Sequence, residues 1–139
     1  MLLNIFSIII VWACVSLQSF NPTPATAPLH QLRIYEVPKE NREFFNARFK
    51  DHAMRIMKKY NFHIVATWES VTDSKLEFVY LLEWKDRETM QESWKNFMAD
   101  QEWKDIKKET AERHGNYVEN IEDRTIVLTD YSPRQSLLK

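Results

Sequence analysis

The spacing of hydrophobic residues changes within the stretch 76–103, and the change predicts a buried strand followed by a helix. Consecutive apolar residues at 78–82 favour a strand covered on both faces, since a strand with one solvated face would alternate. After a polar break, Met90, Trp94 and Phe97 recur at helical spacing. We therefore expect this strand and this helix to form the centre of the hydrophobic core.

An alternating pattern at 29–37 predicts another strand. Leu32 and Ile34 lie on one face of it, and Arg33 and Tyr35 lie on the other. If the face with Arg33 meets a partner subunit, the guanidinium is buried and needs a carboxylate to form a structural ion pair. The candidate carboxylates are Glu69, Glu122 and Asp123.

Apolar residues at intervals of three and four predict a helix at 40–60 with one face on a sheet. That face consists of Phe45, Phe49, His52, Ile56 and Tyr60. We interpret His52 in one of two ways, as a histidine hydrogen-bonded in the core or as a polar group that projects into a ligand pocket between helix and sheet.

The other elements follow from turn and cap residues. Polar residues at 72–75 join two strands into a hairpin. Acidic Asp86 suits the start of the second helix, Asp100 caps a further helical segment, and Gly115 ends it. The predicted order is strand 29–37, helix 40–60, strand 62–70, strand 78–82, helix from 86 with a second segment to 114, and strand 117–128.

This order predicts one α+β domain at 29–133, followed by a tail at 134–139, in which both helices cover the same face of a sheet. Phe78, Tyr80 and Leu82 of the apolar strand then point one way, while Val79 and Leu81 point the other. A wet second face would expose more apolar area than monomers usually do. We therefore predict a homodimer with the two sheets packed face to face.

Residues 1–17 are apolar except for Asn4, Ser7 and Ser16, and no Lys, Arg, Asp or Glu precedes Arg33. We interpret 1–20 as a signal peptide or a membrane anchor and 21–28 as a linker, although a signal peptide usually has a positive residue near its start. Cys14 is the only cysteine and lies within this apolar segment. We interpret it as a small apolar residue of the signal or as a lipidation site. The protein is expected to be secreted or periplasmic, or membrane-anchored.

Composition excludes several kinds of chemistry. The single glycine, Gly115, excludes a P-loop, a Rossmann phosphate turn and a nucleophile elbow. The net charge of −1 and interspersed charges argue against a nucleic-acid partner. The four histidines have no spacing that would direct two imidazoles at one metal ion. We therefore expect no cofactor and no metal.

The tryptophans of the domain fall into two groups. Trp94 and Trp103 stand at helical spacing from other apolar residues, which predicts core packing. Trp68 and Trp84 stand near strand ends and are better candidates for the mouth of a pocket.

Six segments, in the same order, resemble the NIPSNAP family. They are LRIYEV at 32–37, FFNARFKDHAMRIMKKYNF at 44–62, ATWES at 66–70, FVYLLEW at 78–84, ESWKNFMADQEWKDI at 92–106 and LTDYSP at 128–133. Gln101 replaces a proline common in the family, and the turn at Asn61 lacks the usual glycine. The resemblance implies a dimeric α+β barrel of ferredoxin-like βαββαβ subunits with a four-stranded antiparallel sheet, and it implies no defined reaction.

Two functions remain open. The leading one is a non-enzymatic homodimer, exported or membrane-anchored, that binds a small apolar or aromatic ligand or another protein. The alternative is a small-molecule enzyme of the cofactor-independent monooxygenase or isomerase type, by analogy with other dimeric α+β barrels. Those enzymes use the cavity between helices and sheet, so the candidate pocket residues are Arg33, Tyr35, His52, Trp68 and Tyr80.

Overall fold

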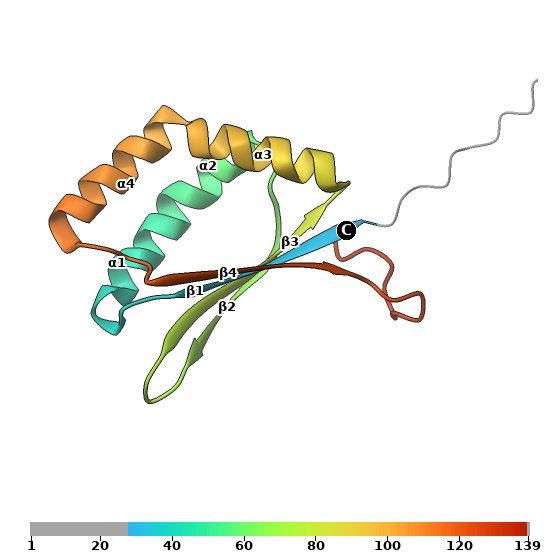
Figure 1. The fold of residues 1–139 in the computed structure, drawn as a ribbon, viewed down its shortest axis with the longest axis horizontal. Helices are drawn as coiled ribbons and strands as arrows, with labels where there is room; N and C mark the ends of the chain where they lie inside the picture. Colours follow the sequence, from blue (N-terminus) through green and yellow to red (C-terminus); the bar gives the residue numbers. More distant parts are fainter. Residues whose placement is uncertain (1–27, 139) are drawn as a thin grey trace, which may run out of the picture.

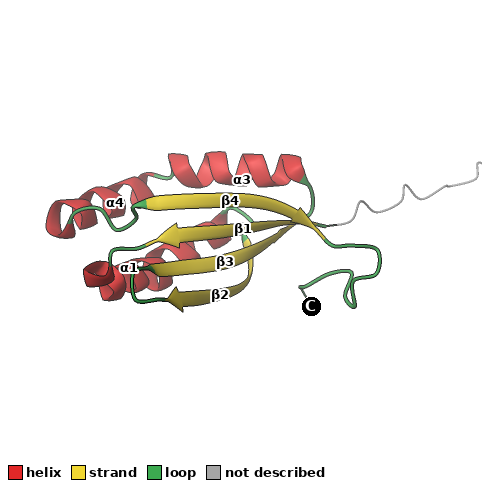
Figure 2. Cartoon of the chain, turned by 60° about the horizontal axis from the view of Figure 1, so that its bottom comes forward, coloured by secondary structure: helices red, strands yellow, loops and turns green. Residues whose placement is uncertain are grey.

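The computed structural model describes residues 28–138, which form a four-stranded antiparallel sheet with helices on one face (Figure 1, Figure 2). The strands β1 (Leu29–Glu36), β2 (His63–Val71), β3 (Leu76–Trp84) and β4 (Asn120–Val127) lie in the order β2-β3-β1-β4. The helical segments are η1 (Lys39–Asn41), α1 (Arg42–Ala47), η2 (Arg48–Ala53), α2 (Met54–Lys59), α3 (Arg87–Ala99) and α4 (Gln101–His114). The predicted α+β class and βαββαβ order are confirmed.

The two faces of the sheet differ as the alternating pattern predicted. Arg33 of β1 lies opposite Tyr80 of β3, and Ile34 lies opposite Val79. Tyr80 is fully buried beneath the helices, whereas Ile34 and Val79 are only half-buried on the other side. We call the side that carries Ile34 and Val79 the outer face; it is the side away from the helices.

Aromatic rings fill the space between the sheet and the helices. The ring of Phe49 lies over Phe78 and Tyr80 of β3, with centroid separations of 4.6 and 5.2 Å. Phe97 of α3 stacks on Trp103 of α4 at 5.1 Å. Each such pair contributes about 0.5–1.5 kcal/mol beyond the burial of its area. These contacts fix the helices on the sheet and on one another.

A π turn interrupts the first long helix and corrects one prediction. Residues Arg48–Ala53 form this turn, which holds more residues than a turn of α-helix. Phe49, Ala53, Ile56 and Met57 are buried here, and His52 is exposed. The prediction that His52 faces the sheet is therefore wrong, because the wider turn puts Ala53 where α-helical spacing would put residue 52.

The predicted ends of the last two helices are confirmed. Asp86 Oδ1 accepts a 2.7 Å hydrogen bond from the backbone N–H of Thr89, and Asp100 Oδ1 accepts a 2.9 Å bond from that of Trp103. These carboxylates satisfy amides that have no partner inside the helix. After α4, Gly115 has φ 72°, a left-handed conformation that glycine adopts easily.

Asn61 forms the turn between α2 and β2 and has φ 60°. The left-handed region disfavours most L-residues, and Asn tolerates it better than most. Asn61 therefore adopts the same backbone conformation that a glycine would adopt at this position.

The segment after β4 returns to the outer face at one end of the sheet (Figure 2). Glu83 of β3 accepts hydrogen bonds from His30 Nε2 (2.9 Å), Ser136 Oγ (2.9 Å) and the backbone N–H of Leu137 (2.6 Å). Burial acts to raise the pKa of Glu83, but the bonds from Leu137, Ser136 and His30 outweigh it and hold that pKa below its ordinary value. Glu83 thus attaches the C-terminal segment to the sheet.

The predicted signal or anchor at 1–20, Cys14 within it, and nearly all of the linker lie outside the described residues. Within 28–138, no helix combines the length and the apolar character needed to span a bilayer.

Candidate functional site

A cavity of about 360 Å³ lies between the helices and the sheet, on the side of β1 and β4. The strands β1 and β4, the first long helix, α3, α4 and the turn after α4 all contribute to its walls. Three lining residues are basic, Arg33, Arg48 and Lys107, and no lining residue is acidic. The others are Tyr35, Phe45, Phe49, Ala53, Met57, Trp94, Phe97, Met98, Trp103, Ala111, Gly115, Asn116, Tyr117, Val118 and Ile121.

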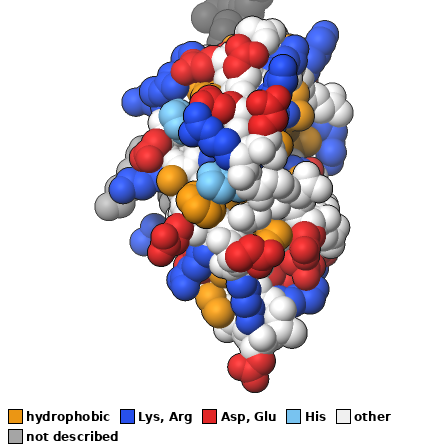
Figure 3. Space-filling model, turned by 90° about the vertical axis from the view of Figure 1, so that its left-hand side faces the viewer, with side chains coloured by type: hydrophobic (Ala, Val, Ile, Leu, Met, Phe, Trp, Pro, Cys, Tyr) orange, Lys and Arg blue, Asp and Glu red, His pale blue; other side chains and the backbone are white. Residues whose placement is uncertain are grey.

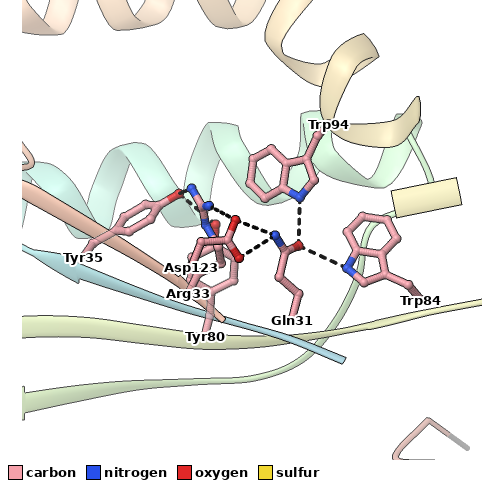
Figure 4. Close-up of polar contacts among 7 residues, drawn as sticks. All are labelled: Gln31, Arg33, Tyr35, Tyr80, Trp84, Trp94 and Asp123. Carbon is pink, nitrogen blue, oxygen red and sulfur yellow. Dashed lines mark hydrogen bonds and ion pairs between the residues drawn. The ribbon is translucent and has the colours of Figure 1, made fainter. Parts of the chain in front are cut away.

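Arg33 lies on the sheet side of the cavity and is held by a carboxylate (Figure 4). Its Nη1 donates a 2.6 Å hydrogen bond to Asp123 Oδ2, and its Nη2 donates a 3.2 Å bond to the hydroxyl of Tyr35. The guanidinium carbon lies 4.7 Å from the centroid of the Trp94 ring. Burial alone would lower the pKa of Arg33, but Tyr35, Tyr80 and Asp123 offset it and raise that pKa. Asp123 is thus the partner among the three candidate carboxylates. Arg33 lies on the helix side of the sheet, however, and not on the face that would meet a partner subunit.

Tyr35 and Tyr80 form a pair beside Arg33 (Figure 4). Their hydroxyl oxygens lie 2.9 Å apart, and their rings meet edge to face. Burial raises the pKa of Tyr80 well above its ordinary value. Tyr80 therefore stays protonated at neutral pH, so it can donate a hydrogen bond but cannot act as a base.

Gln31 connects this group to two tryptophans (Figure 4). Its Oε1 accepts hydrogen bonds from the indole N–H groups of Trp94 (2.8 Å) and Trp84 (3.1 Å). Its Nε2 donates to both carboxylate oxygens of Asp123, each at 2.9 Å. Since Gln31 is only 2% exposed, these bonds fix the Trp94 ring, and with it one wall of the cavity, in the dry interior.

Arg48 and Lys107 form a second cationic group on the helical side of the cavity. The guanidinium carbon of Arg48 lies 4.2 Å from the ring centroid of Tyr117. The same carbon and Lys107 Nζ lie 5.7 and 5.9 Å from the ring centroid of Trp103. Within residues 28–138, neither cation has a carboxylate at ion-pair distance.

The surroundings of these two cations disfavour their charge. Burial lowers the pKa of Arg48. Burial, together with the positive charges of Arg48 and Lys104, lowers the pKa of Lys107. The cavity is therefore apolar and aromatic over most of its wall, with a paired cation at one place and two unpaired cations at another.

Comparison with known proteins agrees with this architecture. The NIPSNAP family model matches residues 30–133. The chain belongs to the NIPSNAP family. Similar solved structures include an uncharacterized NIPSNAP-like domain protein from Burkholderia xenovorans (TM-score 0.64, 15% identity, 78% of this chain and 90% of that chain covered). Another is a NIPSNAP family protein of unknown function from Agrobacterium tumefaciens (TM-score 0.63, 17% identity, 76% and 92% covered). At these identities the likeness shows the fold alone, and a comparison with curated proteins finds no match.

The five candidate residues of this NIPSNAP chain lie in three places. Arg33 and Tyr35 line the cavity, and Tyr80 supports Tyr35 from β3. Trp68 is 50% exposed and lies opposite Val79 in the sheet register, which puts it on the outer face. His52 lines a separate, shallower pocket of about 170 Å³ between the first helix and the end of α4. The structure therefore does not bring His52 and Trp68 together with the other three.

Figure 3 views the side of the molecule that lies at the left of Figure 1. Basic and acidic side chains stand next to each other over this surface, with small hydrophobic areas between them. Within the described part of the chain, no group of three or more His, Cys, Asp or Glu side chains is arranged to hold a metal ion.

Sequence reasoning missed most of the cavity lining, and three of the missed residues matter for its chemistry. Trp94 was assigned to the core, yet it is half-buried, lines the cavity and contacts Arg33. Arg48 and Lys107 each stand among charged neighbours in a helix, a pattern typical of a solvated face. The one available signal was their position next to Phe49 and Ile106, which puts them at the border of the apolar stripe.

Proposed function

We propose that this NIPSNAP chain is a small-molecule-binding module and that its ligand occupies the cavity between the helices and the sheet. The cavity volume of about 360 Å³ carries this proposal, since it falls within the range of roughly 300–1,000 Å³ that ligand pockets occupy. Mostly aromatic walls with a few polar groups are also typical of such pockets. A small apolar or aromatic molecule therefore fits the lining.

The lining supports binding rather than catalysis. None of the lining residues is His, Asp, Glu, Cys or Ser, the side chains that most often act as general bases or nucleophiles. Asp123, the nearest described carboxylate to Arg33, is occupied by that cation and by Gln31. Tyr80 keeps its proton, because burial raises its pKa. The arrangement can hold and orient a molecule.

Binding is tested with a neutral fluorescent probe, N-phenyl-1-naphthylamine, titrated into the purified chain. Ala111 lines the cavity and is exposed, so Ala111→Trp places a large ring in the cavity without replacing a core residue. Ala99→Trp is the matched control, because Ala99 is also exposed, lies at the end of α3 and does not line the cavity.

We expect saturable binding to the wild type and to Ala99→Trp and at least a tenfold loss in Ala111→Trp. Equal binding by all three proteins, or no saturable binding by the wild type, would overturn the proposal. Turnover of a substrate that Ala111→Trp abolishes would favour the enzyme alternative.

We also propose that the module is a homodimer joined through the outer face. Two neighbouring cross-strand rows of apolar side chains support this, Trp68–Val79–Ile34 and Ala66–Leu81–Leu32. An apolar face of this kind on a monomer is unusual and marks an interaction surface. In a two-fold symmetric dimer, the outer face of one copy would pack against the same face of a second copy. Sedimentation of the purified chain as a monomer at micromolar concentration would contradict the dimer.

Export or membrane anchoring remains part of the proposal, on the apolar pattern of residues 1–20 alone. Fractionation of expressing cells tests it. Recovery of the full-length chain only in the cytosol would overturn it.

A further inference from the structure

We propose that the cavity binds its ligand through an oxyanion, a carboxylate or a phosphate, held by Arg48 and Lys107, while the apolar body of the ligand lies against the aromatic wall. This inference rests on the proposed binding function. It adds the charge of the ligand and the position of its charged group.

The first argument is the charge balance of the lining. Of the three basic side chains, Arg33 is neutralised by Asp123 at 2.6 Å. Arg48 and Lys107 have no described carboxylate within ion-pair distance, and no acidic side chain lines the cavity. Partly buried charges are normally paired, so two unpaired cations on one cavity wall leave a place for an anion.

The second argument is that both cations lie against the same aromatic ring. Both come within 6 Å of the centroid of the Trp103 ring. The negative face of the ring offsets only part of their charge. Burial lowers the pKa of both, and the charge of Arg48 lowers that of Lys107 further. A bound oxyanion would relieve this repulsion and accept charge-assisted hydrogen bonds from both.

The third argument is that Arg48 is already oriented. Its Nη1 donates a 3.0 Å hydrogen bond to Thr110 Oγ1, and that hydroxyl lies 2.8 Å from the carbonyl oxygen of Ile106, to which it donates. The guanidinium also lies over the ring of Tyr117 at 4.2 Å. A cation fixed in this way loses little freedom when it binds, and the remaining N–H donors of its guanidinium are available to an anion.

The competing interpretation is purely structural, in which Arg48 packs on the rings of Tyr117 and Trp103 and Lys107 extends past them into solvent. The two interpretations differ in one measurable respect. Only an oxyanion site discriminates between ligands of the same shape and different charge.

The experiment measures the affinity of the full chain for 2-naphthoate, 2-naphthyl phosphate and neutral 2-naphthamide by calorimetry and by displacement of N-phenyl-1-naphthylamine. We expect at least one anion to bind about tenfold or more tightly than the amide, since hydrogen bonds to charged groups are the stronger ones. The anion that binds more tightly shows whether the site prefers a carboxylate or a phosphate.

Variants locate the site. Arg48→Met and Lys107→Met keep an apolar stem, and each should reduce the preference for the anion to less than threefold. Arg48→Lys keeps the charge and should retain part of the preference for the anion. The matched control is Lys108→Met, which removes a charge from an exposed position of α4 that does not line the cavity and should leave the preference unchanged.

Equal affinity of the amide and both anions would overturn the oxyanion site and leave the binding function standing. A preference that survives in both Arg48→Met and Lys107→Met would also overturn it. A failure of the binding function differs, because then neither the naphthyl probes nor N-phenyl-1-naphthylamine binds saturably to the wild type.

Discussion

The indole N–H of Trp94 donates a 2.8 Å hydrogen bond to Gln31 Oε1 and so joins α3 to the central strand β1 through the interior of the protein. The same oxygen accepts the indole N–H of Trp84, and the amide nitrogen of Gln31 donates to Asp123. One buried amide therefore satisfies two tryptophans and the carboxylate that holds Arg33.

Replacement of Gln31 by Leu removes both the acceptor and the donor. The N–H of Trp84, a residue only 1% exposed, is then left without a partner, and Asp123 loses a neutral donor. Because each unsatisfied buried group costs about 1–3 kcal/mol, we expect Gln31→Leu to lower the free energy of unfolding by about 2–4 kcal/mol, measured by urea denaturation. Gln31→Glu keeps the acceptor but sets a second carboxylate beside Asp123. The loss in its free energy of unfolding relative to the wild type should therefore diminish as the pH is lowered. A Leu variant as stable as the wild type would contradict this account.

Glu83 should make stability depend on pH at the acid end. Its pKa is lowered in the folded protein, so its contribution is complete above the unfolded value of about 4.3 and is lost as the pH falls toward and through the folded pKa. The difference in thermal stability between wild type and Glu83→Gln should therefore be large at pH 6 and shrink below pH 4. His30 and His63 lie opposite Glu83 in the sheet, so each is replaced by Gln as a control for its own titration. A difference that stays constant down to pH 3 would exclude this role.

Gly115 should resist substitution for reasons of backbone conformation alone. Its φ of 72° and ψ of −155° fall in a region that only glycine adopts readily, and an added Cβ would meet no atom within 4 Å. Gly115→Ala should therefore cost about 1–3 kcal/mol in chemical denaturation. The neighbouring exposed Asn116, replaced by Ala, is the control and should change stability little. An unaffected Gly115→Ala would show that α4 can end in another way.

Replacing Asn61 by glycine should stabilise the protein, in contrast to the loss expected when Gly115 is replaced. Its φ of 60° is tolerated by Asn and free of strain for Gly, so Asn61→Gly should raise the free energy of unfolding by up to about 1 kcal/mol. Asn61→Ala, which lacks both the polar side chain and the freedom of glycine, should lower it. Chemical denaturation of both variants and the wild type checks the expected order of stability, in which the Gly variant is the most stable and the Ala variant the least.

Trp68 tests the proposed dimer. Trp68 is the largest side chain of the apolar rows, and a charge in its place would be buried in the proposed interface, so Trp68→Glu should shift the chain to the monomer in sedimentation experiments. Thr67→Glu is the matched control, since Thr67 is an exposed neighbour on the same strand whose side chain points to the opposite face. Dimers that persist in Trp68→Glu would place the interface elsewhere.

The two faces of the sheet were predictable because successive side chains of a strand point to opposite sides, as Arg33, Ile34, Val79 and Tyr80 illustrate. The caps at Asp86 and Asp100 were predictable because they depend on residues three positions away. Such features are local in the chain, so the sequence pattern contains them.

The cavity was not predictable in the same way. His52 was misplaced because a π turn leaves no mark in residue spacing. Arg48 and Lys107 line the same cavity only because the helix is interrupted at Asp100 and α4 takes a new direction. The choice of Asp123 over Glu122 depends on the register of β4. These are relationships between distant elements, and single-helix periodicity contains no information about them.

The π turn at Arg48–Ala53 also keeps the two halves of the first helix aligned. A π turn holds one residue more than the α-helix that it interrupts, and it absorbs that residue locally. If the same residues wound as an unbroken α-helix, those after the turn would be rotated by about 100° relative to those before it, and Ala53 and Met57 would turn away from the wall that Phe49 helps to build. Deleting an exposed residue such as Lys50 or Asp51 would leave an ordinary α-helix with the same residues facing the cavity.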